Sequence, residues 1–188
     1  SNIVPQVSAS TERVVMTAIF NDVVLAARGG SIVRGSSGSG SWTSTITGLG
    51  TPTQNYEHRL FNFDGTDKII IATGTSNPQI LNTSFSTSVV NATGTSNFKF
   101  VEVFKNHIFF AGHSSNVQEL SFMGPFETND FTTGNGGGTI KVDTKIVGLK
   151  VFRDSLFIFG EDKIFKLTGN TVSDFAIAPV TRKIGCID

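Results

Sequence analysis

Three histidines and one cysteine are the residues of this chain with the widest range of possible chemistry. His107 and His113 flank an expected strand instead of sharing a helix face, and neither they nor His58 have a second Cys or His pair at metal-ligand spacing. Cys186 is the only cysteine, which excludes an intrachain disulfide and any site that needs two thiolates. We expect it to be a small buried apolar residue or, alternatively, a reactive or interchain thiol. The sequence predicts no metal and no cofactor.

The acidic residues and the glycine-rich stretches form no catalytic or phosphate-binding pattern. Asp64 and Asp67 are spaced as in part of a calcium loop, but the later bidentate carboxylate is missing, which favours a hairpin turn. None of the 15 acids stands out as part of a glycosidase carboxylate pair. The stretches 35–40 and 135–138 are followed neither by Lys-Ser/Thr nor by a helix, which indicates loops. We expect that the protein is not an enzyme.

The charge is balanced, with 15 Lys+Arg and 15 Asp+Glu. No net field favours nucleic acid or an anionic membrane, so a general DNA-binding protein is not expected. Basic residues near the C-terminus are interpreted as solvated strand positions or, alternatively, as contacts to nucleic acid or an acidic partner. They are Lys163, Lys166, Arg182 and Lys183. The N-terminal stretch lacks a basic segment followed by an apolar run, so we expect a soluble chain without a signal peptide or a membrane partner.

A repeated strand unit is the element that would position any functional residue. The segment VFKNHIFFAG at 103–112 aligns without gaps with VFRDSLFIFG at 151–160, an offset of 48 residues. Four positions are identical and three are conservative. Each copy reads as strand, tight turn and strand, with Asn106 and Asp154 where a hairpin tolerates positive φ. Weaker copies lie at 20–29 and 67–74.

The spacing of these copies predicts the architecture. Anchored on Ala26, Ala72, Ala111 and Phe159, they lie 46, 39 and 48 residues apart, which fits β-propeller blades of roughly 40 to 50 residues. No window of helical length carries an apolar stripe. We expect an all-β fold, a single β-propeller-like domain over 1–188 with about four blades. The four blades close a ring by themselves, or they are part of a larger ring that missing residues or neighbouring subunits complete. Expected strands include 23–27, 31–34, 42–47, 156–159, 163–167 and 172–178, and single helical turns are allowed at 53–57 or 124–130.

Two features are candidates for contact with other molecules. The longest irregular stretch, 124–138, suits an exposed loop, and its candidate interface residues are Phe126, Asn129, Phe131 and Asn135. The chain has 17 Phe but one Tyr and one Trp, so most aromatic rings should enter a core. Trp42 is the candidate aromatic anchor for a glycan.

The segment 148–169, with its continuation PVTRKIGC at 179–186, resembles virion structural proteins of tailed bacteriophages. It looks like the propeller-containing tail tubular, tail nozzle or head-to-tail stabilisation proteins, and LAARGGSI at 25–32 is similar to their opening blade. In that family the RKIGC segment leads into further strands, whereas this sequence stops at Asp188. A fragment, a processed chain and a shortened relative all remain open.

This resemblance implies a structural component of a bacteriophage virion, in the tail, neck or nozzle, or baseplate, assembled in the host cytoplasm. The implied partners are copies of the chain itself and other virion proteins, with DNA passing without specific binding. A receptor- or glycan-binding adhesin of the virion is the alternative, against which the scarcity of Tyr and Trp counts. A propeller enzyme such as a glycosidase ranks third, because no catalytic constellation is found.

Overall fold

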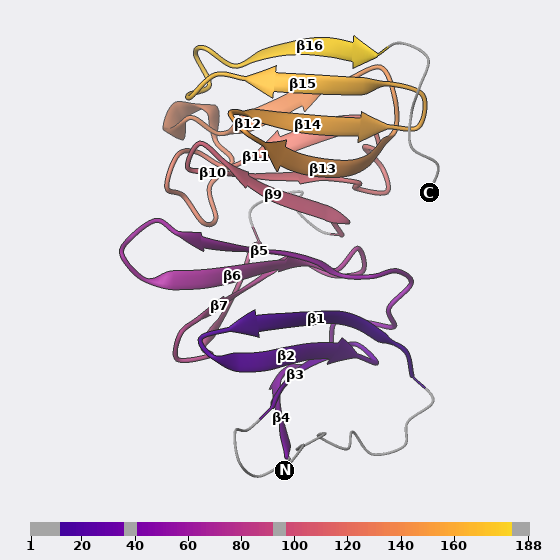
Figure 1. Cartoon of the computed structure of the whole chain (residues 1–188), viewed down its shortest axis with the longest axis vertical. Helices are drawn as coiled ribbons and strands as arrows, with labels where there is room; N and C mark the ends of the chain where they lie inside the picture. Colours follow the sequence, from indigo (N-terminus) through magenta and orange to yellow (C-terminus); the bar gives the residue numbers. More distant parts are fainter. Residues whose placement is uncertain (1–11, 36–40, 92–96, 182–188) are drawn as a thin grey trace.

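The structure is a computed structural model that describes residues 12–35, 41–91 and 97–181 (Figure 1). These residues form four antiparallel sheets of four strands each, and consecutive strands are neighbours in every sheet. Each sheet is therefore one blade, and the chain has a four-blade β-propeller-like fold. The prediction of an all-β fold with about four blades is confirmed.

Blades 1 and 2 occupy the N-terminal half. Blade 1 contains β1 (Val14–Phe20), β2 (Val23–Arg28), β3 (Ser31–Gly35) and β4 (Trp42–Ile46). Blade 2 contains β5 (Glu57–Asn62), β6 (Asp67–Ala72), β7 (Gln79–Asn82) and β8 (Thr87–Val89).

Blades 3 and 4 occupy the C-terminal half. Blade 3 contains β9 (Phe100–Phe104), β10 (His107–Ala111), β11 (Glu119–Phe122) and β12 (Gly138–Lys141). Blade 4 contains β13 (Ile146–Phe152), β14 (Ser155–Gly160), β15 (Ile164–Thr168) and β16 (Ala176–Thr181).

Tight turns with positive φ join the first two strands of three blades. Asn21 and Asp22 have φ of 50° and 59°, and Lys105 and Asn106 have φ of 48° and 61°. These values belong to the hairpin turns whose twist matches that of the flanking strands. The expected role of Asn106 is confirmed. The expectation for Asp154 was wrong, because the residue with positive φ in the β13–β14 turn is Arg153, with φ of 54°.

In blade 2 the corresponding turn is longer and contains Asp64, while Asp67 is the first residue of β6. Asp64 Oδ1 accepts a hydrogen bond from the Thr66 amide at 3.2 Å, and Asp64 Oδ2 lies 2.6 Å from Lys68 Nζ. These hydrogen bonds hold the pKa of the Asp64 carboxyl below its usual value. The segment joins two antiparallel strands, so the hairpin interpretation is confirmed.

Alternation along each strand sends one face of a blade toward the preceding blade and the other face toward the next. Three buried clusters fill the three junctions. The junction of blades 1 and 2 includes Ala18, Leu25, Ala27, Ile32, Ile69, Ile71 and Leu81. The junction of blades 2 and 3 includes Phe61, Ile70, Ala72, Val101, Ile108 and Phe110. The junction of blades 3 and 4 includes Phe104, Phe109, Ala111, Phe122, Leu149, Leu156, Ile158 and Leu167.

The repeat alignment is corrected by one residue in blade 1. Ala27 belongs to the junction with blade 2, as Ala111 belongs to the junction with blade 4, whereas Ala26 is absent from that cluster. Ala27 is therefore the equivalent of Ala111, and the anchor on Ala26 was wrong. A slip of one residue turns a side chain to the opposite face of its sheet.

Two local expectations were also wrong. The last strand begins at Ala176 and not near 172, because the carboxylate of Asp174 accepts hydrogen bonds from the amides of Asn170 and Thr171 and closes a turn there. The one helical turn of the described residues is a 3-10 turn at Thr133–Asn135, outside both 53–57 and 124–130.

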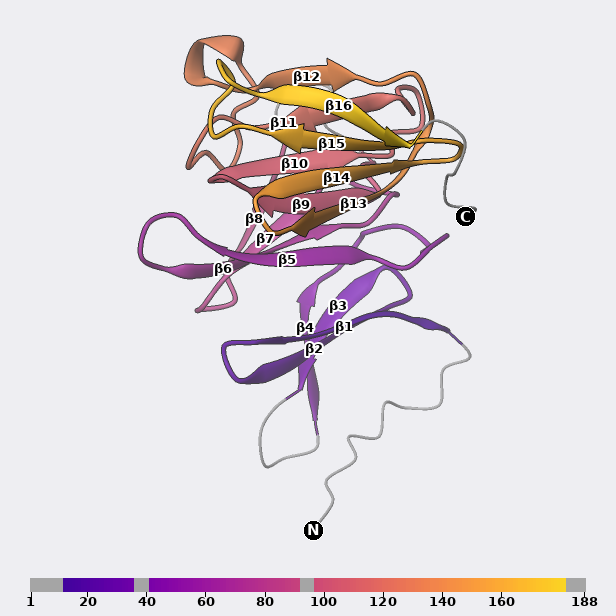
Figure 2. The same cartoon turned by 45° about the horizontal axis from the view of Figure 1, so that its top comes forward.

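The blades form an open arc. β5 lies beside β1, β9 beside β5 and β13 beside β9. Figures 1 and 2 place blade 1 and blade 4 at opposite ends of this series, with β5 and β9 between β1 and β13. Within the described ranges, no helix has the length and hydrophobicity that a bilayer crossing needs. The arc leaves one face of blade 4 and one face of blade 1 outside the three junctions.

Candidate functional site

The outward face of blade 4 is an apolar hollow. It consists of Lys150, Phe152, Phe157, Phe159, Ile164 and Val180, which we call the open face of blade 4. The depression over these residues is open to solvent and has a volume of about 370 Å³. These residues alternate with the ones that pack against blade 3, such as Leu149 and Ile158. Phe152 is 60% exposed. A sheet face built mainly from phenylalanine and branched residues therefore has no partner among the described residues.

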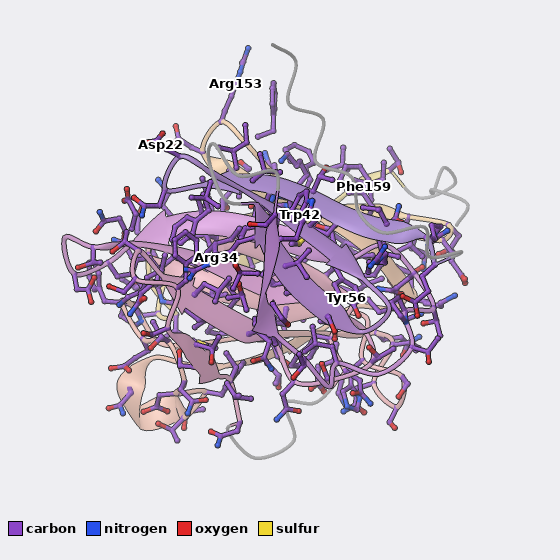
Figure 3. The ribbon with its side chains drawn as sticks, turned by 90° about the horizontal axis from the view of Figure 1, so that it is seen from below. Asp22, Arg34, Trp42, Tyr56, Arg153 and Phe159 are labelled. Carbon is purple, nitrogen blue, oxygen red and sulfur yellow. The ribbon has the colours of Figure 1, made fainter. Side chains whose placement is uncertain are left out.

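The opposite end of the arc carries a second apolar face. Cross-strand pairs share a face, and in blade 1 these pairs are Ile19 with Val24, Ala26 with Val33, and Gly35 with Trp42. We call Ile19, Val24, Ala26, Val33 and Trp42 the open face of blade 1. Ile19 is 71% exposed and Val24 is 47% exposed. Figure 3 views the molecule from this end and labels Trp42 there.

Trp42, the candidate aromatic anchor, thus lies on a strand of this face. Two atoms of its six-membered ring stand 3.7 Å from the position that a Cβ on Gly35 would take, so the ring covers the glycine. Its indole nitrogen is buried and has no hydrogen-bond partner among the described residues. This arrangement offers a partner the apolar ring of Trp42 but not its indole N–H. A glycan-binding role for Trp42 stays a prediction.

A charged cluster crosses the inner strands of blades 2 to 4. Arg59, Glu102 and Lys150 stand at the same register position, opposite Ile70, Phe109 and Phe157 respectively. Their charges alternate in sign from blade to blade.

Glu102 is the centre of this cluster and is only 4% exposed. Its carboxylate lies 2.7 Å from Arg59 Nε and 3.8 Å from Lys150 Nζ, and it accepts a hydrogen bond from the Val151 amide at 3.3 Å. Glu57 lies 3.3 Å from Arg59, and burial raises the pKa of its carboxyl. The cluster ties three blades together and places Lys150 at the border of the open face of blade 4.

The candidate interface loop at 124–138 folds back onto its own blade and its neighbour. The amide of Phe126 donates to the Asn106 carbonyl at 2.8 Å, and its ring meets that of Phe63 edge to face at 5.9 Å. Phe131 packs on Phe110 with a centroid distance of 5.8 Å. Phe126 is 58% exposed, so it is the phenylalanine of this loop that a partner would reach.

The two candidate asparagines hold the loop in place. The side chain of Asn129 accepts a hydrogen bond from the Asn91 amide at 2.9 Å and donates to the Asn91 side chain at 3.0 Å. Asn135 donates to Asp130, which also accepts a hydrogen bond from the Thr132 amide at 2.7 Å. These bonds lower the pKa of the Asp130 carboxyl. The structure gives both asparagines an internal structural role, and their part in an interface stays a prediction.

The histidines do not gather into a site. In the described ranges, no group of three or more His, Cys, Asp or Glu side chains is arranged to hold a metal ion. His107 is 1% exposed and packs on Phe109, Phe122 and Phe175, and burial lowers its pKa. Burial likewise lowers the pKa of His58.

Of the basic residues near the C-terminus, Lys163 lies 2.5 Å from Asp143, and this hydrogen bond raises the pKa of the ammonium group. Lys166 pairs with Phe157 and so shares the outward side of blade 4. Arg182, Lys183 and Cys186 lie outside the described residues.

Sequence reasoning did not identify the two open faces or the charged cluster. A signal for the open face of blade 4 was present, since Phe157 and Phe159 alternate with core residues in the strongest repeat. A charged residue within an apolar strand, Glu102 between Val101 and Val103, was the signal for the cluster.

Comparison with known proteins defines the class of fold. The sequence matches no protein-family model and no curated protein. Among solved structures, virginiamycin B lyase from Staphylococcus aureus is similar with a TM-score of 0.57 at 12% identity over 87% of this chain and 53% of the lyase. A chain of the nidogen/laminin complex gives a TM-score of 0.58 at 14% identity over 88% of this chain and 64% of that chain.

The computationally designed Ika4 protein is similar over 96% of both chains, with a TM-score of 0.55 at 8% identity. The present chain thus spans about half of the lyase and nearly all of the designed protein. At these identities the likeness shows the fold alone, that of a β-propeller-like protein. The resemblance to phage proteins remains an expectation from the sequence.

Proposed function

We propose that this chain is a structural component of a bacteriophage virion, in the tail, neck or nozzle, or baseplate, and that it works by presenting rigid interfaces to other subunits. The observation that carries the assembly role is the pair of open apolar faces at the two ends of the blade arc. The sequence resemblance at 148–186 supports the virion as the setting.

Leaving these apolar faces in water costs free energy. Each exposed phenylalanine or isoleucine that becomes buried contributes about 1.5–3 kcal/mol. Large contiguous apolar patches on a folded protein mark interaction sites. The open face of blade 4 contains three phenylalanines, so association with another apolar surface is strongly favoured.

The experiment is the protein composition of purified virions, measured by mass spectrometry of peptides with quantified stoichiometry. We expect peptides of this chain at a fixed small number of copies per particle. The control is a host cytoplasmic protein, whose signal should fall on repeated gradient purification while that of this chain stays constant. Absence of the chain from the particle would overturn the virion assignment.

The adhesin alternative has a separate readout. Binding to a glycan array that is lost in Trp42→Ala, with the fold unchanged by circular dichroism, would favour it over the structural role. The position of Trp42 on a strand face, with its indole nitrogen buried, argues for packing against a protein surface.

A further inference from the structure

We propose that the open face of blade 4 binds the open face of blade 1 of a second copy of this chain, so that two chains close one eight-blade ring. The proposal rests on the assembly role proposed above and names the partner. It follows from the register of the blades, from the charges at their turns and from the shape of the arc.

The open face of blade 4 repeats a face that is covered elsewhere in the molecule. In the gapless alignment, Phe157 and Phe159 take the positions of Phe109 and Ala111 in blade 3. Phe109 and Ala111 are fully buried against blade 4. The surface that covers them is the face of blade 4 that is turned toward blade 3, which we call the back face of the blade. The matching partner for Phe157 and Phe159 is therefore the back face of another blade.

Blade 1 offers a back face of this kind. In blade 4, the back face that covers blade 3 carries Leu156 and Ile158. The equivalent positions of blade 1 are Val24 and Ala26, on its open face. Trp42 adds a large ring to this face, of the residue type that most often anchors protein interfaces. Two apolar sheet faces of this kind pack as the three internal junctions do.

The charges at the turns of blades 4 and 1 are complementary. Lys105, the first turn residue of blade 3, lies with its Nζ 3.4 Å from Oδ1 of Asp154, the second turn residue of blade 4. Arg153 is the first turn residue of blade 4, and Asp22 is the second turn residue of blade 1. A junction from blade 4 to blade 1 would therefore pair Arg153 with Asp22 by the same geometry.

In the single chain these two residues are available for that pairing. No ion pair to Arg153 or Asp22 occurs among the described residues, and the Arg153 guanidinium lies over the Phe152 ring at 5.3 Å. Figure 3 shows both side chains at the same edge of the molecule, although they belong to opposite ends of the arc in Figure 1.

The blade 1 that meets the open face of blade 4 belongs to a second copy and not to the same chain. Blade 1 and blade 4 lie at opposite ends of the molecule, with blades 2 and 3 stacked between them (Figures 1 and 2). The two open faces of one chain therefore do not meet. Two copies related by a two-fold axis make two identical junctions and leave no open face. Eight blades fall within the usual range of about 4 to 8 for a closed propeller.

The test measures the mass of the 188-residue chain by sedimentation velocity and native mass spectrometry. We expect twice the chain mass of 20.1 kDa. Phe152→Asp should give a monomer, because it places a carboxylate in the apolar junction. Phe126→Asp is the matched control: Phe126 is 58% exposed against 60% for Phe152, but it lies outside both open faces, so the dimer should persist. Circular dichroism checks that both variants keep the fold.

Charge reversal tests the register of the junction. Asp22→Arg and Arg153→Asp should each weaken the dimer by about tenfold, since each places like charges at both junctions, and the double variant should recover most of the affinity. The proposal would be overturned if the unaltered chain were a monomer or if Phe152→Asp left the dimer intact. It would also be overturned if the double variant dimerised no more tightly than the single variants. Growth into longer oligomers would overturn the closed ring. Dimerisation is measured on the isolated chain, so its outcome is independent of whether virions contain the protein.

Discussion

The guanidinium Nε of Arg59 lies 2.7 Å from the carboxylate Oε1 of Glu102, which joins the inner strand of blade 2 to that of blade 3. Glu102 is almost fully buried and also accepts hydrogen bonds from the amides of Val103 and Val151. Its removal would leave the partly buried Arg59 without its closest carboxylate and with Glu57, at 3.3 Å, as its remaining ion-pair partner. We expect Glu102→Ala to lower the free energy of unfolding by about 3–5 kcal/mol, measured by urea denaturation.

The matched control for this change is Glu161→Ala. Glu161 also makes a 2.7 Å ion pair, with Lys145, but its side chain is 52% exposed. Exposed ion pairs contribute less than about 1 kcal/mol. Equal losses for the two variants would contradict a role of burial in the Arg59–Glu102 pair.

His107 should make the stability of the protein depend on pH. Its Nδ1–H donates to the Lys105 carbonyl at 2.6 Å, and its Nε2 is buried without a partner among the described residues. Burial lowers the pKa of His107 below 6.5, so the unfolded chain takes up a proton that the folded chain resists. Stability is therefore complete above pH 6.5 and is lost as the pH falls from 6.5 through the lowered pKa.

The variant His107→Phe keeps an aromatic ring among Phe109, Phe122 and Phe175 and removes the titrating group. We expect a smaller loss in urea midpoint between about pH 7.5 and about pH 5 than in the unaltered protein. Part of the dependence should remain, because burial also lowers the pKa of His58. An unchanged slope would show that His107 does not contribute.

Asn106 should be sensitive to the shape of the replacing residue. Its φ of 61° lies in the left-handed region, which costs a β-branched residue roughly 1–2 kcal/mol. We expect Asn106→Val to be less stable by about that amount and Asn106→Gly to stay within about 0.5 kcal/mol of the unaltered protein, by thermal denaturation. If valine and glycine gave the same melting temperature, the turn geometry would be different from the one described.

Phe109 tests the junction of blades 3 and 4. It is fully buried and stacks on Phe122 with centroids 5.3 Å apart. We expect Phe109→Ala to cost about 3–5 kcal/mol in unfolding free energy. Phe126→Ala, at an exposed position, should cost less than about 1 kcal/mol. The comparison is made at one protein concentration, and similar costs would contradict the assignment of Phe109 to the core.

The repeat and its turns could be predicted from the sequence because they depend on local chemistry. Asn106 tolerates positive φ, and the alternation of Phe157, Ile158 and Phe159 is that of a strand with apolar residues on both faces. Five of the six expected strands agree with observed strands to within one residue at each end, the exception being 172–178. The start of the last strand was predicted wrongly because side-chain hydrogen bonds of Asp174 compete there with strand pairing. The repeat alignment was one residue off at Ala26, because both Ala26 and its neighbour Ala27 fit the pattern.

The exposure of the interface loop at 124–138 could be predicted from the sequence, but its contacts could not. Its glycines and polar residues predicted an exposed excursion, and Phe126 is exposed. The hydrogen bonds between Asn91 and Asn129 could not be foreseen, because they join residues 38 positions apart. Composition predicts that a segment is an exposed loop, whereas the contacts that hold its asparagines depend on how neighbouring blades stack.

By itself, the sequence determined that this protein is all-β, built from about four similar blades and neutral in charge, because strand alternation, turn chemistry and repeat spacing are local properties. Only the tertiary structure decided which faces are covered. Every blade has apolar residues on both sides, and the stacking order alone leaves Phe152 and Ile19 in water while it buries Phe109 and Ala18. The same stacking brings Arg59 and Lys150 to Glu102, since inner strands far apart in the chain become neighbours only in the arc.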